Sequence, residues 1–248
     1  MRRVVVILLI AVALFLFYSI ATHTDKPKDI ETYHFDFDEI DKDFWLVSEW
    51  ESYKRAYDLV KIDNGILELS QDVTGIMPYM LSKPLELQSK DVLTIKRRIK
   101  ISHGLDTFSG GLALYQTLDL ELMPEPTDGA WFTAFGDGVA LIEYSYDLTH
   151  ETERPGKDVF RFLAADWEYN DNYQLVTPVY DEWVDETLIF DMRSNQMIYK
   201  LGDKEYKLYS YKLDKSAVRI LMHPYGTGTG NIIEIDSMDV TIEDKSTR

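Results

Sequence analysis

Three carboxylates lie close together in one segment, at Glu234, Asp236 and Asp239. The apolar residues around them alternate as in a β-strand, but their parity changes between Ile235 and Met238. A β-bulge of one extra residue near Asp236 would restore a continuous apolar face and bring the three carboxylates together on the other face. Two carboxyl groups about 5–5.5 Å apart are what retaining glycoside hydrolysis requires. The three residues are therefore the candidate catalytic groups.

The same segment also fits a strand that does no chemistry. Charged residues on an antiparallel strand mostly face water while the alternate apolar residues face the core. The sequence leaves both interpretations open. We favour a non-enzymatic function, and keep as alternatives the hydrolase and an envelope ectodomain that is structural or binds proteins.

A second constellation combines aromatic rings with short polar side chains. Sugars stack their C–H faces on aromatic rings, while amides and carboxylates hydrogen-bond their hydroxyls. The alternative for each ring is packing in the core or at its rim. The sequence predicts a glycan-binding surface that draws on Trp131, Glu143, Trp167, Tyr169, Asn172, Tyr173 and Trp183.

Aspartates also gather at positions 36, 38, 41 and 43, and again at 236 and 239. Paired terminal strands would bring the two groups near each other, and calcium prefers several carboxylate and carbonyl oxygens. Asp36 and Asp236 are the candidate ligands of a structural Ca²⁺. Acidic clusters are usually just solvated, so a protein without any cofactor is the alternative.

The elements that must position these residues are short strands separated by turns. Asn64-Gly65 between two apolar runs indicates a hairpin, and residues 44–57 read as a short helix or turn. About ten such strands predict an all-β antiparallel sandwich or barrel, in one domain over residues 33–245. The expected strands are 57–61, 66–69, 91–101, 110–116, 139–146, 159–165, 173–179, 187–193, 197–201, 218–223 and 232–243.

The order of these segments resembles a known superfamily. The resemblance is carried by residues 63–69 (DNGILEL), 81–85 (LSKPL), 91–96 (DVLTIK), 109–115 (SGGLALY) and 231–240 (NIIEIDSMDV). This progression resembles the concanavalin A-like lectin/glucanase superfamily, which includes laminin-G-type modules and laminarinase/lichenase hydrolases.

The resemblance implies a two-sheet jelly-roll sandwich whose first and last strands lie side by side. It also implies ligand sites on the concave face or on the loops at its rim. The hydrolases carry a Glu-x-Asp-x-x-Glu strand, which would make Glu234 the nucleophile and Asp239 the acid/base. This chain has Asp in place of the last Glu.

Composition narrows the possible partners. The 248 residues include 26 Lys and Arg against 43 Asp and Glu, a formal net charge of −17. Such a surface repels phosphate backbones, so we expect no nucleic-acid partner. The chain has no cysteine, which excludes disulfides and thiol chemistry. Polysaccharides or other glycans are the expected partners, and the oligomeric state stays open.

The first residues have the layout of an export signal. Arg2 and Arg3 precede a mostly apolar stretch of 18 residues from Val4 to Ala21, which has small residues at Ser19 and Ala21. Residues 1–21 therefore predict a signal peptide cleaved after Ala21, or a membrane anchor, since the run approaches the about 20 residues of a membrane-spanning helix. Residues 22–32 read as a linker. We expect an extracellular or cell-surface domain, of bacterial origin.

Overall fold

The computed structural model describes residues 30–49, 57, 60–70, 78–102, 108–116, 138–146, 159–164, 173–209, 217–226 and 232–244. The predicted signal or anchor over residues 1–21 lies outside this part of the chain. Within the residues described, no helix is long and apolar enough to cross a membrane.

The described residues form sixteen strands in two antiparallel sheets of eight strands each. In sheet A the order is β14-β13-β12-β7-β16-β4-β3, and β1 pairs with β16 beyond the end of β4. The last strand of the chain is therefore a central strand of its sheet. The strands of sheet A are β1 (Glu31–Phe35), β3 (Lys61–Asp63), β4 (Ile66–Ser70), β7 (Asp91–Ile101), β12 (Val184–Asp191), β13 (Gln196–Leu201), β14 (Lys204–Tyr209) and β16 (Ile232–Asp244).

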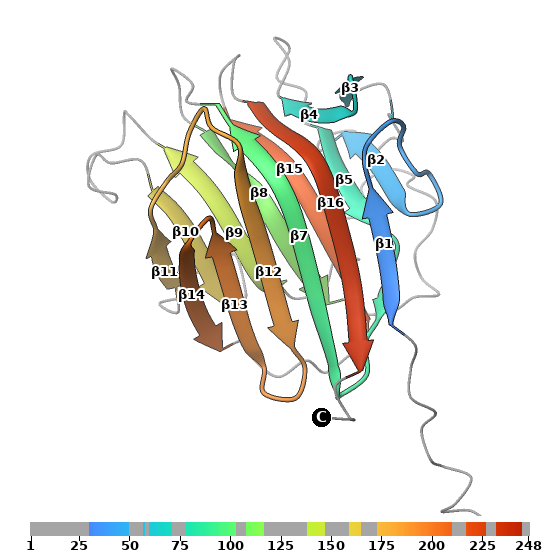
Figure 1. Cartoon of the computed structure of the whole chain (residues 1–248), viewed down its shortest axis with the longest axis vertical. Helices are drawn as coiled ribbons and strands as arrows, with labels where there is room; N and C mark the ends of the chain where they lie inside the picture. Colours follow the sequence, from blue (N-terminus) through green and yellow to red (C-terminus); the bar gives the residue numbers. More distant parts are fainter. Residues whose placement is uncertain are drawn as a thin grey trace, which may run out of the picture.

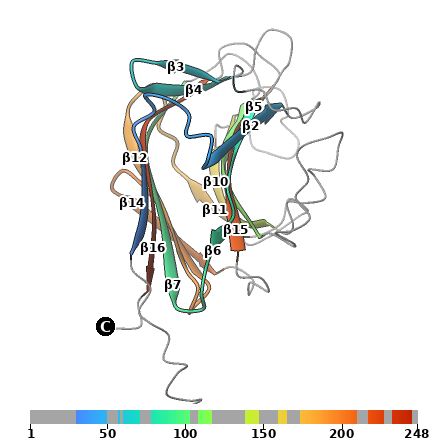
Figure 2. The ribbon, with the colours of Figure 1, turned by 90° about the vertical axis from the view of Figure 1, so that its right-hand side faces the viewer.

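Sheet B lies behind sheet A in Figure 1 and faces it in Figure 2. Its order is β11-β10-β9-β8-β15-β5-β2, and β6 pairs with β15 next to the place where β5 does. The strands of sheet B are β2 (Trp45–Glu49), β5 (Pro78–Ser82), β6 (Leu85–Glu86), β8 (Phe108–Gln116), β9 (Gly138–Tyr146), β10 (Val159–Ala164), β11 (Tyr173–Val176) and β15 (Ala217–Gly226).

The core fills the space between the two sheets, because alternate residues of nearly every strand point inward. On β16 the inward positions hold Ile233, Ile235, Met238, Val240 and Ile242, all at most 1% exposed. The pairing with β7 shifts register between Ile235 and Ser237. The predicted bulge is confirmed, and it keeps one apolar face along the whole strand.

The predicted hairpin at Asn64-Gly65 is also confirmed. It joins β3 to β4, and both turn residues have positive φ, 53° and 77°. Two such residues characterise the type I′ turn, whose twist matches that of the flanking strands. A Cβ on Gly65 would lie in ordinary van der Waals contact with the carbonyl oxygen of Asp36, at 3.4 Å, so the positive φ is what favours glycine at this position.

Two local expectations were wrong. Residues 45–49, read as part of a short helix or turn, form strand β2. Trp45 and Val47 are buried there, and Trp45 meets Phe44 at 4.9 Å between ring centroids. Core packing of these rings outweighs the weak helical pattern. The strand expected over residues 57–61 begins only at Lys61.

One ion pair lies inside the core. Arg97 of β7 and Glu186 of β12 are 3% and 1% exposed, and the Arg97 Nε donates to Glu186 Oε2 at 2.7 Å. The Tyr199 hydroxyl donates to the other carboxylate oxygen, Oε1, at 2.9 Å. Phe162 of sheet B packs on the Tyr199 ring, with centroids 5.5 Å apart. The opposite charges of Arg97 and Glu186 thus compensate each other inside the core, where two aromatic rings pack beside them.

Candidate functional site

The three carboxylates of β16 lie together on the outer face of sheet A, as the bulge requires. Each has a basic neighbour on an adjacent strand. Lys100 Nζ is 2.5 Å from Glu234 Oε2, Arg98 Nε is 3.7 Å from Asp236 Oδ2, and His34 Nδ1 is 2.7 Å from Asp239 Oδ1. Strand β7 thus supplies two of the three partners, Lys100 and Arg98.

These contacts bear on the predicted chemistry. A carboxylate held as an anion by a cation can act as a nucleophile, but a general acid needs a raised pKa. In this structure a basic side chain already contacts each of the three carboxylates. The catalytic roles of Glu234, Asp236 and Asp239 stay predictions.

The contact between β1 and β16 has a consequence that can be measured. The hydrogen bond to Asp239 raises the pKa of His34 above 6.5, and the negative charges of Asp239 and Asp36 act in the same direction. We expect NMR titration of the His34 ring to give a pKa above 6.5, and Asp239→Asn to lower it. Asp236→Asn should leave it unchanged, and an equal fall in both variants would contradict the contact.

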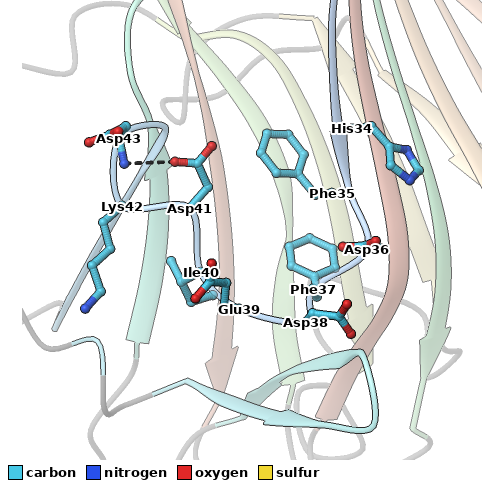
Figure 3. A pocket seen from close by; sticks show the side chains of 10 residues that line it. All are labelled: His34, Phe35, Asp36, Phe37, Asp38, Glu39, Ile40, Asp41, Lys42 and Asp43. Carbon is cyan, nitrogen blue, oxygen red and sulfur yellow. Dashed lines mark hydrogen bonds between the residues drawn. The ribbon is translucent and has the colours of Figure 1, made fainter.

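The aspartates after β1 line a pocket with a volume of about 680 Å³ (Figure 3). Asp41 is engaged in a turn there, because its Oδ1 accepts the backbone N–H groups of Asp43 and Phe44 at 2.9 and 3.1 Å. Among the described residues, no three acidic or histidine side chains converge in a way that could hold a metal ion. A calcium ion bound by Asp36 and Asp236 stays a prediction.

Four of the predicted glycan-binding residues, Trp131, Trp167, Tyr169 and Asn172, lie outside the described residues. Tyr173 begins β11 in sheet B and is 45% exposed. Trp183 precedes β12 in sheet A, with Lys100 Nζ 5.9 Å from its ring centroid. Because they belong to different sheets, these two rings do not form one row on a single sheet. Glu143 is in β9, between Gly111 of β8 and Arg161 of β10 in the register.

Sequence reasoning missed the outer face of sheet B. Along β15, Val218, Ile220 and Met222 belong to the core, so Arg219, Leu221 and His223 point to the opposite side. Leu221 forms a second hydrophobic cluster on that side with residues of β5 and β8, and Leu46 of β2 packs against it. The buried members of this cluster are Tyr79, Leu81, Ala113, Tyr115 and Leu221.

Two basic side chains are buried beside this cluster. His223 is 4% exposed and Arg219 is 8% exposed. Burial lowers the pKa of His223 to about 4, so its imidazole is neutral at pH 7. Burial also lowers the pKa of Arg219, to about 10, which leaves the guanidinium charged. The cluster thus joins tyrosine rings, a neutral imidazole and a guanidinium, the mixture of apolar and polar groups that lines ligand sites.

We name the set of Tyr79, Tyr115, Arg219, Leu221 and His223 the sheet B face. The sequence contained a signal for this face, because residues 218–223 alternate between two sets. Val218, Ile220 and Met222 are all apolar, whereas Arg219, Leu221 and His223 are mixed in character. The sequence did not indicate that the side chains of both sets would be buried.

Comparison with known proteins identifies the fold. No protein-family model and no curated protein sequence matches the chain. Among solved structures, peanut lectin with a 9-residue peptide has a TM-score of 0.56 and 13% identity, covering 87% of this chain and 98% of that one. The endo-1,3-beta-glucanase from Streptomyces sioyaensis has a TM-score of 0.57 and 10% identity, covering 89% and 99%.

The acidic lectin of winged bean, complexed with methyl-α-D-galactose, has a TM-score of 0.56 and 12% identity, covering 87% of this chain and 99% of that one. Likeness at such low identity establishes the architecture and not an activity. The two eight-stranded sheets and the neighbours agree with the fold that the sequence resemblance implied. The chain has the concanavalin A-like jelly-roll fold.

Proposed function

We propose that this chain is a carbohydrate-binding domain, exported from the cell, and that it binds glycans through the sheet B face. The observation that carries the proposal is the second buried cluster on sheet B, which packs on the side away from the inter-sheet core. A sandwich needs one core between its sheets to be stable. A second cluster that mixes tyrosines with buried basic groups calls for a further explanation.

The chemistry of the sheet B face suits a sugar. Tyr79 and Tyr115, 1% and 6% exposed, would form an aromatic floor beneath a bound pyranose, and the imidazole of His223 would lie beside its hydroxyls. Solved structures with this architecture include a lectin complexed with methyl-α-D-galactose and another complexed with GalNAc. Export rests on residues 1–21 alone and is part of the proposal.

Calorimetric titration of the full chain in detergent against bacterial-wall and plant polysaccharides tests this function. We expect binding in the wild type and at least tenfold weaker binding in Tyr115→Leu, which removes the aromatic ring and the hydroxyl and keeps a buried apolar side chain. The matched control is Tyr209→Leu, because Tyr209 is 61% exposed at the edge of sheet A. Equal affinities in the two variants would place binding elsewhere, and no binding of any polysaccharide would refute the function.

A glycoside hydrolase is the second candidate, and the confirmed bulge of β16 favours it by gathering three carboxylates on one face. Glu234→Gln should then abolish the turnover of β-glucans, while Glu243→Gln on the same strand should not. The basic side chain that already contacts each carboxylate weighs against this candidate. Wild-type protein without any turnover would dismiss it, and would leave a structural or protein-binding ectodomain as the remaining alternative to glycan binding.

A further inference from the structure

Arg219 is a buried cation for which the described part of the chain provides no counter-charge. It is 8% exposed, no described carboxylate lies within ion-pair distance, and its Nε has no hydrogen-bond partner. Desolvation of its side chain is the cause of its lowered pKa. An ionised group that is buried without a partner is costly, so its presence needs a reason.

The same protein shows how it neutralises a buried arginine when the arginine serves the fold. Arg97 is buried to a similar degree, and Glu186 supplies a carboxylate at 2.7 Å from its Nε. Arg219 is the counterpart on the other sheet without such a glutamate. The difference between the two sites indicates that the anion for Arg219 comes from outside the described chain.

The position of Arg219 in the sheet agrees with a ligand site. The side chain is on the outer side of β15, and Tyr115 of β8 is its register partner. On the other side of β15 the ladder is interrupted, because β5 pairs through Leu221 and Met222 while β6 pairs through Ala217 and Val218. The Ser82 hydroxyl accepts the Ile220 N–H at 2.9 Å across this interruption. The sheet is thus irregular beside the guanidinium.

We propose that the ligand of the sheet B face is a saccharide carrying a carboxylate, such as a uronate unit, and that Arg219 binds this carboxylate. The inference rests on the carbohydrate-binding function proposed above and specifies its substrate class. A guanidinium binds a carboxylate through two parallel hydrogen bonds, which a neutral sugar cannot replace. The tyrosine rings beside it would stack on the sugar ring that bears the acid.

The net charge of −17 sets a further condition. It repels an anionic ligand at long range, and salt screens this repulsion, whereas a buried ion pair is screened much less. Affinity for the acidic saccharide should therefore hold or rise when NaCl increases from about 50 mM to about 500 mM. A steep loss of affinity with salt would assign binding to exposed lysines and arginines and overturn the role of Arg219.

The decisive experiment uses the full chain in detergent and a panel of polygalacturonate, alginate and hyaluronan, each beside its carboxyl-reduced, neutral counterpart. We expect at least one acidic form to bind about 10- to 100-fold more tightly than its neutral counterpart, because the neutral form cannot make charge-assisted hydrogen bonds with the guanidinium. Equal affinity of both forms overturns the inference and leaves the proposed function standing. No binding of either form, here or to the neutral polysaccharides, removes both.

Arg219→Met provides a second readout. It should bring the affinity for the acidic form down to that of the neutral form and should raise the midpoint of thermal unfolding, because it removes an uncompensated buried charge. Arg98→Met, on the outer face of sheet A, is the matched control and should leave the affinity unchanged. A lower unfolding midpoint in Arg219→Met would mean that the chain itself supplies the partner, which overturns the inference.

Discussion

Replacing Glu186 with Gln is expected to lower the free energy of unfolding by about 3–5 kcal/mol, the cost of removing one partner from a buried ion pair. The variant keeps the size of the side chain and leaves the Arg97 guanidinium, 3% exposed, without its counter-charge. It also weakens the acceptor of the Tyr199 hydroxyl. Urea unfolding followed by tryptophan fluorescence measures the change.

A double variant separates the charge from the packing. Arg97→Met with Glu186→Leu removes both charges and keeps apolar volume, and should recover most of the loss, because a buried ion pair adds little over apolar side chains that pack well. The matched control is Glu205→Gln, which breaks the exposed pairs with Lys200 and Lys207 and should leave the unfolding midpoint nearly unchanged. An effect of Glu186→Gln no larger than that control would contradict the buried pair.

Acid is expected to destabilise the protein by about 3 kcal/mol through His223 alone, between pH 6.5 and pH 4. In the folded protein burial lowers the pKa of this side chain from 6.5 to about 4. Below pH 6.5 the unfolded chain therefore binds a proton that the folded chain does not. The contribution of His223 is fully present above pH 6.5 and is lost as the pH falls through about 4.

The measurement compares unfolding free energies at pH 7.5 and at pH 4 in the wild type and in His223→Gln. The variant should lose less stability on acidification by about 3 kcal/mol, while carboxylates titrate alike in both proteins. His34→Gln serves as the control of opposite sign, because the raised pKa of His34 gives stability below pH 6.5 that is lost as the pH rises. An unchanged pH dependence in His223→Gln would show that the imidazole is not desolvated.

The sequence predicted those parts of the fold in which one face of a strand is apolar and the other polar. The limits of β7 agree with the expected residues 91–101, and the parity change on β16 located its bulge. Strand β5 could not be predicted in this way, because all five of its residues are buried and show no alternation. Its two faces contribute to two different clusters, and only the pairing with β15 reveals this.

The surroundings of the buried charged residues, in the core and in the candidate site, were less accessible to prediction, because they depend on strand order. Arg97 has the parity of the buried residues of β7, and Glu186 has the parity of Leu188 and Phe190 on β12. Two charges of opposite sign at core positions are a readable signal, but they are 89 residues apart and only adjacent strands bring them together. The same holds for Arg219, because only the folded sheet shows that the described residues give it no counter-charge.

The pairing of β1 with β16 joins the two ends of the folded domain, with His34 and Asp239 205 residues apart in the chain. Contacts of such separation slow folding, since a long loop must close before they form. Because β16 lies between β7 and β4, sheet A stays divided into two halves until the last strand has been synthesised. Sheet A therefore cannot be completed before β16 is available to pair with β7 and β4.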